Sequence, residues 1–156
     1  MAAAYKTLDY AVTGAIATIL LDKPETLNAF SQQMRSELLA VFSDLENNSA
    51  VRVVLFGSTG KAFSSGADLV EGIGEHKTVE DQLMKEYAPL LDKMANLPQP
   101  IIAVVPGVMA GIGAAFAMNC DLVVMSDTGS MLMAFTNIGL SKGVSADCGR
   151  RSHECA

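Results

Sequence analysis

Two apolar segments, each followed by a glycine-containing loop, constrain the fold of this chain most strongly. Residues 51–56 lead into the loop 60–69, and residues 101–105 lead into the loop 106–113. Short runs of β-branched and apolar residues predict buried strands. Each loop is expected to end where a helix begins, so that unpaired backbone N–H groups point outward. Two such loops facing one cavity would hold an oxyanion between them.

Composition excludes several classes of protein. The 156 residues fit a single domain, and the absence of Trp, with 6% aromatic residues and nine Met, predicts an aliphatic, Met-rich core. A net charge of −6 argues against nucleic acid as a partner, because phosphate binding needs a basic surface. Three Cys do not form a disulfide framework, so we expect a reducing compartment, the cytoplasm.

One uncharged segment, residues 101–118, raises the question of a membrane span. Its length is marginal for a transmembrane helix, and Gly107 and Gly111 have the spacing of a helix-pairing motif. However, Pro106 and Gly113 help to divide the segment into a short strand and a short helix. We therefore expect a buried strand–turn–helix unit and no membrane partner.

Strands and helices alternate along the chain, which favours an α/β layered fold. Ser31 is a good N-cap for the first helix, whose apolar residues repeat at helical spacing. A hairpin turning at Thr13 and Gly14 is expected to join the first two strands. The predicted strands are 5–10, 15–21, 51–56, 101–105, 122–125 and 131–133, and the predicted helices are 32–47, 79–97 and 113–118.

Two cofactor patterns are incomplete. The glycine cluster at 111–116 opens a helix as a dinucleotide-binding fingerprint would, but Phe116 stands where that motif needs Gly or Ala. Cys148, His153 and Cys155 are residue types that bind metals, but three such residues in an irregular tail do not by themselves indicate a metal site. We expect neither a metal nor a dinucleotide cofactor.

The polar residues after the first loop allow two interpretations. Asp68 is expected to cap a short helix that extends to Ile73. Glu71, Glu75 and His76 are close enough in sequence to supply acid–base chemistry. A solvated polar patch around them explains the same residues, and this is the interpretation that we favour.

Four segments together resemble the enoyl-CoA hydratase/isomerase (crotonase) family. They match in order across about residues 5–140, and they are 21–30 (LDKPETLNAF), 61–69 (KAFSSGADL), 106–121 (PGVMAGIGAAFAMNCD) and 134–140 (AFTNIGL). The resemblance implies a crotonase-like spiral of strand–strand–helix units that ends early at its C-terminus. It implies an incomplete acyl-CoA-binding domain at 1–140, followed by an irregular tail at 141–156.

The resemblance also assigns roles to the two loops. The backbone N–H groups of Ala67 and Ile112 would donate to the oxygen of a thioester enolate, with coenzyme A entering as part of the substrate and no separate cofactor. Gly66 and Gly111 would allow the thioester to approach the backbone closely. The residues expected to bind the substrate are Ser65, Gly66, Ala67, Asp68, Leu69 and Gly111.

Two positions depart from the family pattern. Hydratases of this family carry two glutamates that activate water, and the matching residues here are Ala115 and Phe135. Neither side chain can transfer a proton, so isomerase-like enolate chemistry is favoured over hydration, with the side-chain acid or base unassigned.

The tail leaves an alternative open. Residues 141–156 match none of the family's continuing sequence, so a truncated or frame-shifted chain with little or no activity remains a hypothesis. Such a chain would expose apolar surface, and self-association or aggregation is expected on that account. The resemblance also implies a homo-oligomer, which the absence of the family's C-terminal region would weaken.

Overall fold

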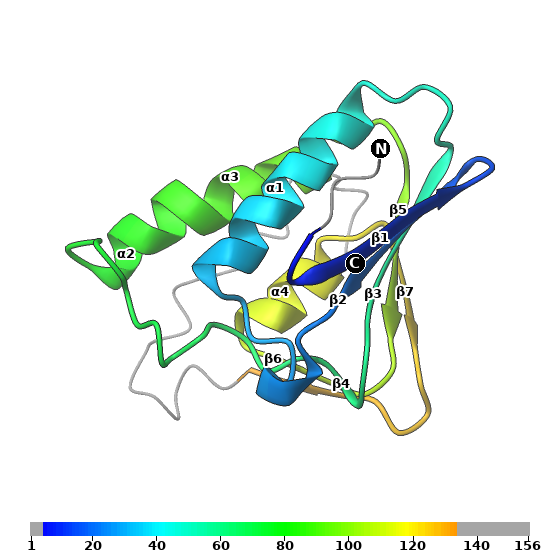
Figure 1. Cartoon of the computed structure of the whole chain (residues 1–156). Helices are drawn as coiled ribbons and strands as arrows, with labels where there is room; N and C mark the ends of the chain where they lie inside the picture. Colours follow the sequence, from blue (N-terminus) through cyan, green and yellow to red (C-terminus); the bar gives the residue numbers. More distant parts are fainter. Residues whose placement is uncertain (1–4, 134–156) are drawn as a thin grey trace, which may run out of the picture.

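The computed structural model describes residues 5–133, whose strands form two sheets (Figure 1). The larger sheet has the order β1-β2-β3-β5-β7. Its first two strands pair antiparallel, and each later pair is parallel. The strands are β1 (Leu8–Thr13), β2 (Ile16–Leu21), β3 (Val53–Ser58), β5 (Ile101–Val105) and β7 (Leu122–Met125).

Alternating burial explains how the larger sheet forms. Along β2, Ala17, Ile19 and Leu21 are fully buried while the residues between them are not, as expected for a strand with one face on the core. The predicted hairpin between β1 and β2 is present, with β1 beginning and ending three residues later than expected. The predicted strand at 51–56 is likewise shifted to Val53–Ser58.

A second, smaller sheet carries the two loops. Its three strands are parallel in the order β4-β6-β8, and they are β4 (Ala62–Ser64), β6 (Val108–Ala110) and β8 (Ser130–Leu132). Neither β4 nor β6 was predicted, because three residues are too few to show a hydrophobic period. β4 lies inside the first glycine-containing loop and β6 lies inside the second. Part of each loop is therefore a strand of this sheet.

The helices lie on one side of the larger sheet (Figure 1). The Ser31 hydroxyl accepts the Met34 N–H at 3.2 Å, which confirms the predicted N-cap of the first helix. A short 3-10 helix, η1, precedes it. The helices are η1 (Pro24–Thr26), α1 (Gln32–Glu46), α2 (Val79–Gln82), α3 (Ala88–Ala95) and α4 (Ile112–Met118).

The helix predicted at 79–97 contains a change of register. Between α2 and α3, residues Leu83–Tyr87 form a π-helical segment, and the Ala88 N–H bonds to Leu83 O. Pro89 cannot donate the regular bond to Lys85 O, and this explains why the register changes here.

The uncharged segment 101–118 is divided among β5, β6 and α4. Within residues 5–133, no helix is long and apolar enough to cross a membrane. The far edge of both sheets exposes apolar side chains, and the most exposed on β7 are Leu122 and Val124. The predicted tail at 141–156 lies outside the described residues.

Candidate active site

The two glycine-containing loops meet at Gly66. A Cβ atom placed on Gly66 would lie 3.0 Å from Ala110 O and 3.7 Å from Ile112 N. The backbone of the first loop therefore packs directly against the start of α4. Gly66 also has a φ of 102°, which a residue with a side chain rarely adopts.

A single parallel bridge between Phe30 and Ala67 sets the direction of the Ala67 N–H. Its two hydrogen bonds run from Phe30 N–H to Gly66 O at 2.8 Å and from Asp68 N–H to Phe30 O at 3.4 Å. In a parallel pair, the residue between these two bonding groups points its own N–H away from the partner strand. The Ala67 N–H is thus directed away from Phe30, and Ala67 itself is exposed.

The Ile112 N–H is the first amide of α4. Helices cannot pair their first amides internally, and Gly111 provides no side-chain cap. Gly111 has φ 51° and ψ −124°, a conformation that only glycine adopts readily. Its own N–H bonds to Leu132 O at 2.9 Å, which fixes the turn on β8.

Gly113 and Ser64 bring α4 and β4 into close contact. A Cβ atom on Gly113 would lie 2.7 Å from Ser64 Cβ. Ser64 is fully buried, and its hydroxyl donates to Asn28 O at 2.8 Å and accepts the Gly66 N–H at 3.0 Å. The same side chain therefore supports the first loop and the N-terminal turn of α4.

Asn28 ties the segment before α1 to the first loop. It is fully buried and has a φ of 55°, which Asn tolerates better than most residues. Its Nδ2 donates to Thr59 O at 2.9 Å and to Ala62 O at 3.0 Å, while its Oδ1 accepts the Lys23 N–H at 2.8 Å. All hydrogen-bonding groups of this amide except one lone pair are used.

The prediction of a short helix from Asp68 to Ile73 is wrong. Residues after Asp68 form consecutive turns, in which Gly72 and Gly74 have φ values of 62° and 58° that interrupt a right-handed helix. The Asp68 carboxylate does cap these turns, accepting the N–H groups of Val70 and Glu71 at 2.9 and 3.3 Å. The Ala67 N–H is therefore directed by the bridge to Phe30 and not by a helix N-terminus.

The other predicted site residues are placed as follows. Ser65 is exposed, and its hydroxyl donates to Thr26 O at 3.1 Å. Leu69 is 69% exposed, beside the solvent-facing turns. Ala115 lies in α4 and is 9% exposed. Phe135 and the trio Cys148, His153 and Cys155 lie outside the described residues.

A buried ionic cluster around Arg35 was not predicted. Arg35 is 5% exposed on α1, and its guanidinium donates to Phe30 O and pairs with Glu86. It also bonds to the Tyr87 hydroxyl at 2.9 Å, and His76 Nε2 lies 3.0 Å from Glu86 Oε1. The sequence signal was a charge three residues before Leu38, on the apolar side of a predicted helix.

Electrostatics in this cluster favour the ionised carboxylate. Burial would raise the pKa of Glu86, but the hydrogen bond from His76 and the charge of Arg35 together hold it below its ordinary value. Burial raises the pKa of Tyr87, although Arg35 acts in the opposite direction. The favoured interpretation of a solvated patch therefore needs correction. Glu75 is exposed, but His76 is paired with Glu86. Glu71 is exposed and still accepts the Gln32 N–H at 2.7 Å.

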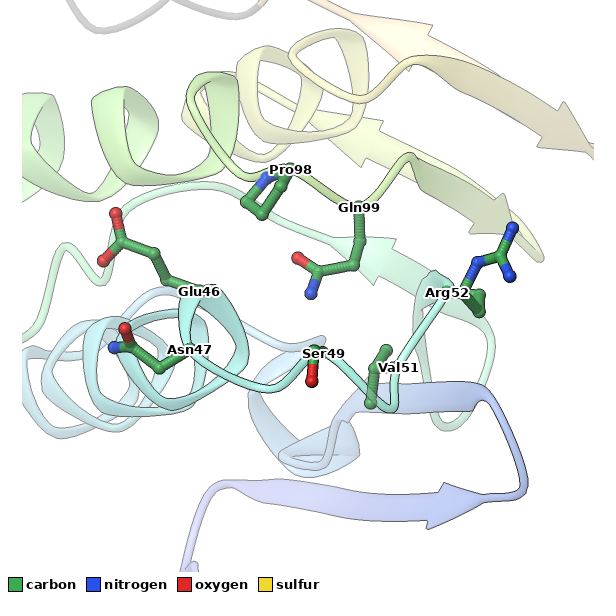
Figure 2. A pocket seen from close by; sticks show the side chains of 7 residues that line it. All are labelled: Glu46, Asn47, Ser49, Val51, Arg52, Pro98 and Gln99. Atoms are coloured by element: carbon green, nitrogen blue, oxygen red, sulfur yellow. The ribbon is translucent and has the colours of Figure 1, made fainter.

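Two cavities lie outside the meeting point of the loops. One, of about 270 Å³, is lined by Arg35, Glu86 and His76, together with residues of the turns after Asp68. The other, of about 310 Å³, is shown in Figure 2, where the Arg52 guanidinium points away from the Gln99 amide. Gln99 is 7% exposed and donates to Leu45 O and Asn48 O. Neither cavity is lined by Ala67 or Ile112.

Comparisons with known proteins point to one family. The enoyl-CoA hydratase/isomerase family model matches residues 11–148, so the match extends beyond residue 140, where the resemblance was expected to end. A protein named probable enoyl-CoA hydratase from Rhodobacter capsulatus is 40% identical over 136 residues, which are 87% of this chain and 52% of that protein. The 1,2-epoxyphenylacetyl-CoA isomerase of Escherichia coli is 32% identical over 88% of this chain and 53% of its own length.

Solved structures show the same relationship. An enoyl-CoA hydratase from Mycobacterium avium superposes with a TM-score of 0.76 at 30% identity, covering 88% of this chain and 51% of that one. The chain spans about half the length of the curated relatives that it matches.

Proposed function

Because this chain belongs to the enoyl-CoA hydratase/isomerase family, we propose that it binds an acyl-CoA thioester and stabilises its enolate with the N–H groups of Ala67 and Ile112. The thioester oxygen becomes negatively charged when a proton leaves the neighbouring carbon. Two backbone donors aimed at one point stabilise that charge without having to reorganise.

The contact between the two loops at Gly66 is the observation that supports this proposal most strongly. A Cβ atom on Gly66 would reach to 3.7 Å from Ile112 N, so the peptide that carries the Ala67 N–H lies next to the peptide that carries the second donor. Loss of one such donor typically costs on the order of 3–4 kcal/mol of transition-state stabilisation.

The residues around the donors fit a substrate that approaches along the backbone. At Gly111 nothing lies within 4 Å of the position that a Cβ would take, whereas at Gly66 that position faces Ala110 O. Ser65 and Leu69 are exposed on the first loop, and Asp68 is half-exposed. We propose that this stretch lines the acyl-CoA path. Coenzyme A then enters as part of the substrate, and no separate cofactor is needed for this chemistry.

Isomerisation of a double bond is favoured over hydration. Hydration needs side chains that position and deprotonate water. Ala115 carries a methyl group on the first turns of α4, where it cannot do so. Enolate stabilisation by the two N–H groups serves both reactions. The absence of a carboxylate at Ala115 therefore weighs against hydration and leaves isomerisation as the favoured reaction.

The test compares two substrates on the full chain. Binding is first measured by calorimetry with a saturated acyl-CoA. A 3-enoyl-CoA and a 2-enoyl-CoA are then supplied separately, and the conjugated thioester is followed by its absorbance. We expect binding, and conversion of the 3-enoyl thioester without appreciable hydration. Absence of binding would overturn the acyl-CoA proposal, and hydration at an ordinary enzymatic rate would overturn the preference for isomerisation.

A further inference from the structure

Arg35 is a buried cation, and one of its partners is the carbonyl oxygen of Phe30, the residue that pairs with the first loop. Burial of a charge is costly unless it is paired and hydrogen-bonded. The Arg35 guanidinium pairs with Glu86 and bonds to the Tyr87 hydroxyl, and it also lies 4.7 Å from the centroid of the Tyr87 ring. Its Nε is buried and has no hydrogen-bond partner among residues 5–133. A second carboxylate, Glu71, lies 4.0 Å from Arg35 Nη2.

One guanidinium nitrogen, Nη1, donates to the carbonyl oxygen of Phe30. That oxygen also accepts the Asp68 N–H at 3.4 Å and lies 3.5 Å from the Tyr87 hydroxyl. The Phe30 N–H bonds to Gly66 O on the other side of the same bridge. Arg35 therefore holds Phe30 in place, and Phe30 in turn sets the direction of the Ala67 N–H.

The side chain of Phe30 extends this link to the second loop. Its ring stacks on Phe116 with centroids 4.4 Å apart and planes at 13°. Phe116 lies on α4, whose first residue is Ile112. Phe30 thus contacts the first loop through its backbone and the helix of the second loop through its ring.

We propose that Arg35 is a positioning residue that aligns the Ala67 N–H, acting through the carbonyl oxygen of Phe30. The proposal rests on the function proposed above for Ala67 and Ile112. Glu86 holds the guanidinium in place and is itself held by His76. Arg35 itself does not touch the thioester.

The planar shape of the guanidinium is essential to this role. It donates in several fixed directions, whereas a lysine ammonium is a compact charge on a flexible stem. Arg35→Lys therefore keeps the charge opposite Glu86 but loses the simultaneous bonds to Phe30 O and the Tyr87 hydroxyl. Arg52→Lys is the matched control, because Arg52 is exposed at the cavity of Figure 2, outside this cluster.

The test uses a chromophoric thioester, 4-(dimethylamino)cinnamoyl-CoA, whose absorption moves to longer wavelength when its carbonyl oxygen accepts hydrogen bonds. Titration into the full chain gives both the wavelength shift and the dissociation constant. In Arg35→Lys we expect about half of the shift to be lost, because one of two donors is misaligned. The dissociation constant should rise less than about tenfold, the change expected for one net hydrogen bond.

Glu86→Gln provides a second variant, which removes the carboxylate charge while keeping the shape of the side chain. It should also reduce the wavelength shift, and Arg52→Lys should leave it unchanged. A shift of wild-type size in a folded Arg35→Lys or Glu86→Gln chain would overturn the positioning role alone. A wild-type chain that binds the probe without any shift, or does not bind it, would overturn the proposed function and this role with it.

Discussion

The ring of Phe30 stacks on the ring of Phe116 at a centroid distance of 4.4 Å. Both rings are fully buried, and they belong to segments separated by most of the described chain. Because the Phe30 backbone pairs with the first loop and Phe116 lies on α4, this stack holds together the two elements that carry the proposed donors.

The stack should appear as a coupling energy in a double-mutant cycle of Phe30→Leu and Phe116→Leu. We expect the two changes to be non-additive by about 0.5–1.5 kcal/mol, the range for stacked aromatic pairs. Urea unfolding of the single and double variants measures this energy. A cycle of Phe116→Leu with Phe42→Leu should be additive, and additivity in the Phe30 cycle would contradict the role of the stack.

Asn28→Asp should destabilise the chain by about 2–4 kcal/mol, because two N–H donors are replaced by an acceptor facing Thr59 O and Ala62 O. Asn48→Asp is the matched control. The Asn48 side chain only accepts, from Ala50 N–H at 3.2 Å, and Asp can do the same. Thermal or urea unfolding distinguishes the two, and equal stabilities would show that the Asn28 donors are not needed.

Gly66→Ala should destabilise the chain more than Gly14→Ala. Both residues have a positive φ, so an alanine at either position is strained by about 1–2 kcal/mol. Only at Gly66 does the added Cβ also meet a backbone atom, Ala110 O at 3.0 Å, while nothing lies within 4 Å at Gly14. Unfolding midpoints give the comparison. Similar losses for the two variants would mean that the loops are not in close contact.

The Glu86 carboxylate should stabilise the fold near neutral pH and lose its effect in acid. Its folded-state pKa lies below the ordinary value of 4.5, so its contribution is present above that value and disappears as the pH falls through the folded pKa. Glu86→Gln should therefore be less stable than the wild type at pH 7, with a smaller difference in acid. Urea unfolding across this pH range tests it, with exposed Glu80→Gln as the control. A difference that does not change with pH would contradict the assignment.

The parts of the fold with a clear period were predictable from the sequence. The apolar spacing of α1, the Ser31 cap and the β-branched strands are set by local residues, and the structure confirms them. Strand limits moved by two or three residues because pairing with neighbouring strands, and not local preference, decides where a strand ends.

The support of the proposed site could not be predicted in the same way. The two loops were identified from their glycines, but the bridge between Phe30 and Ala67 joins residues far apart in sequence. The helix expected after Asp68 failed because Gly72 and Gly74 adopt positive φ values, which no apolar period reveals. Arg35 could have been recognised as a charge on an apolar helix face, although its partners depend on the tertiary fold.

Amide NMR tests most directly whether Ala67 N–H and Ile112 N–H bind one thioester oxygen. Butyryl-CoA has the thioester carbonyl without a reactive double bond, and free coenzyme A lacks that carbonyl. We predict that butyryl-CoA moves the proton resonances of both amides downfield, and that both shifts saturate at the same concentration of butyryl-CoA. Free coenzyme A should not move them. Binding of butyryl-CoA with either amide left at its unliganded position would contradict the account.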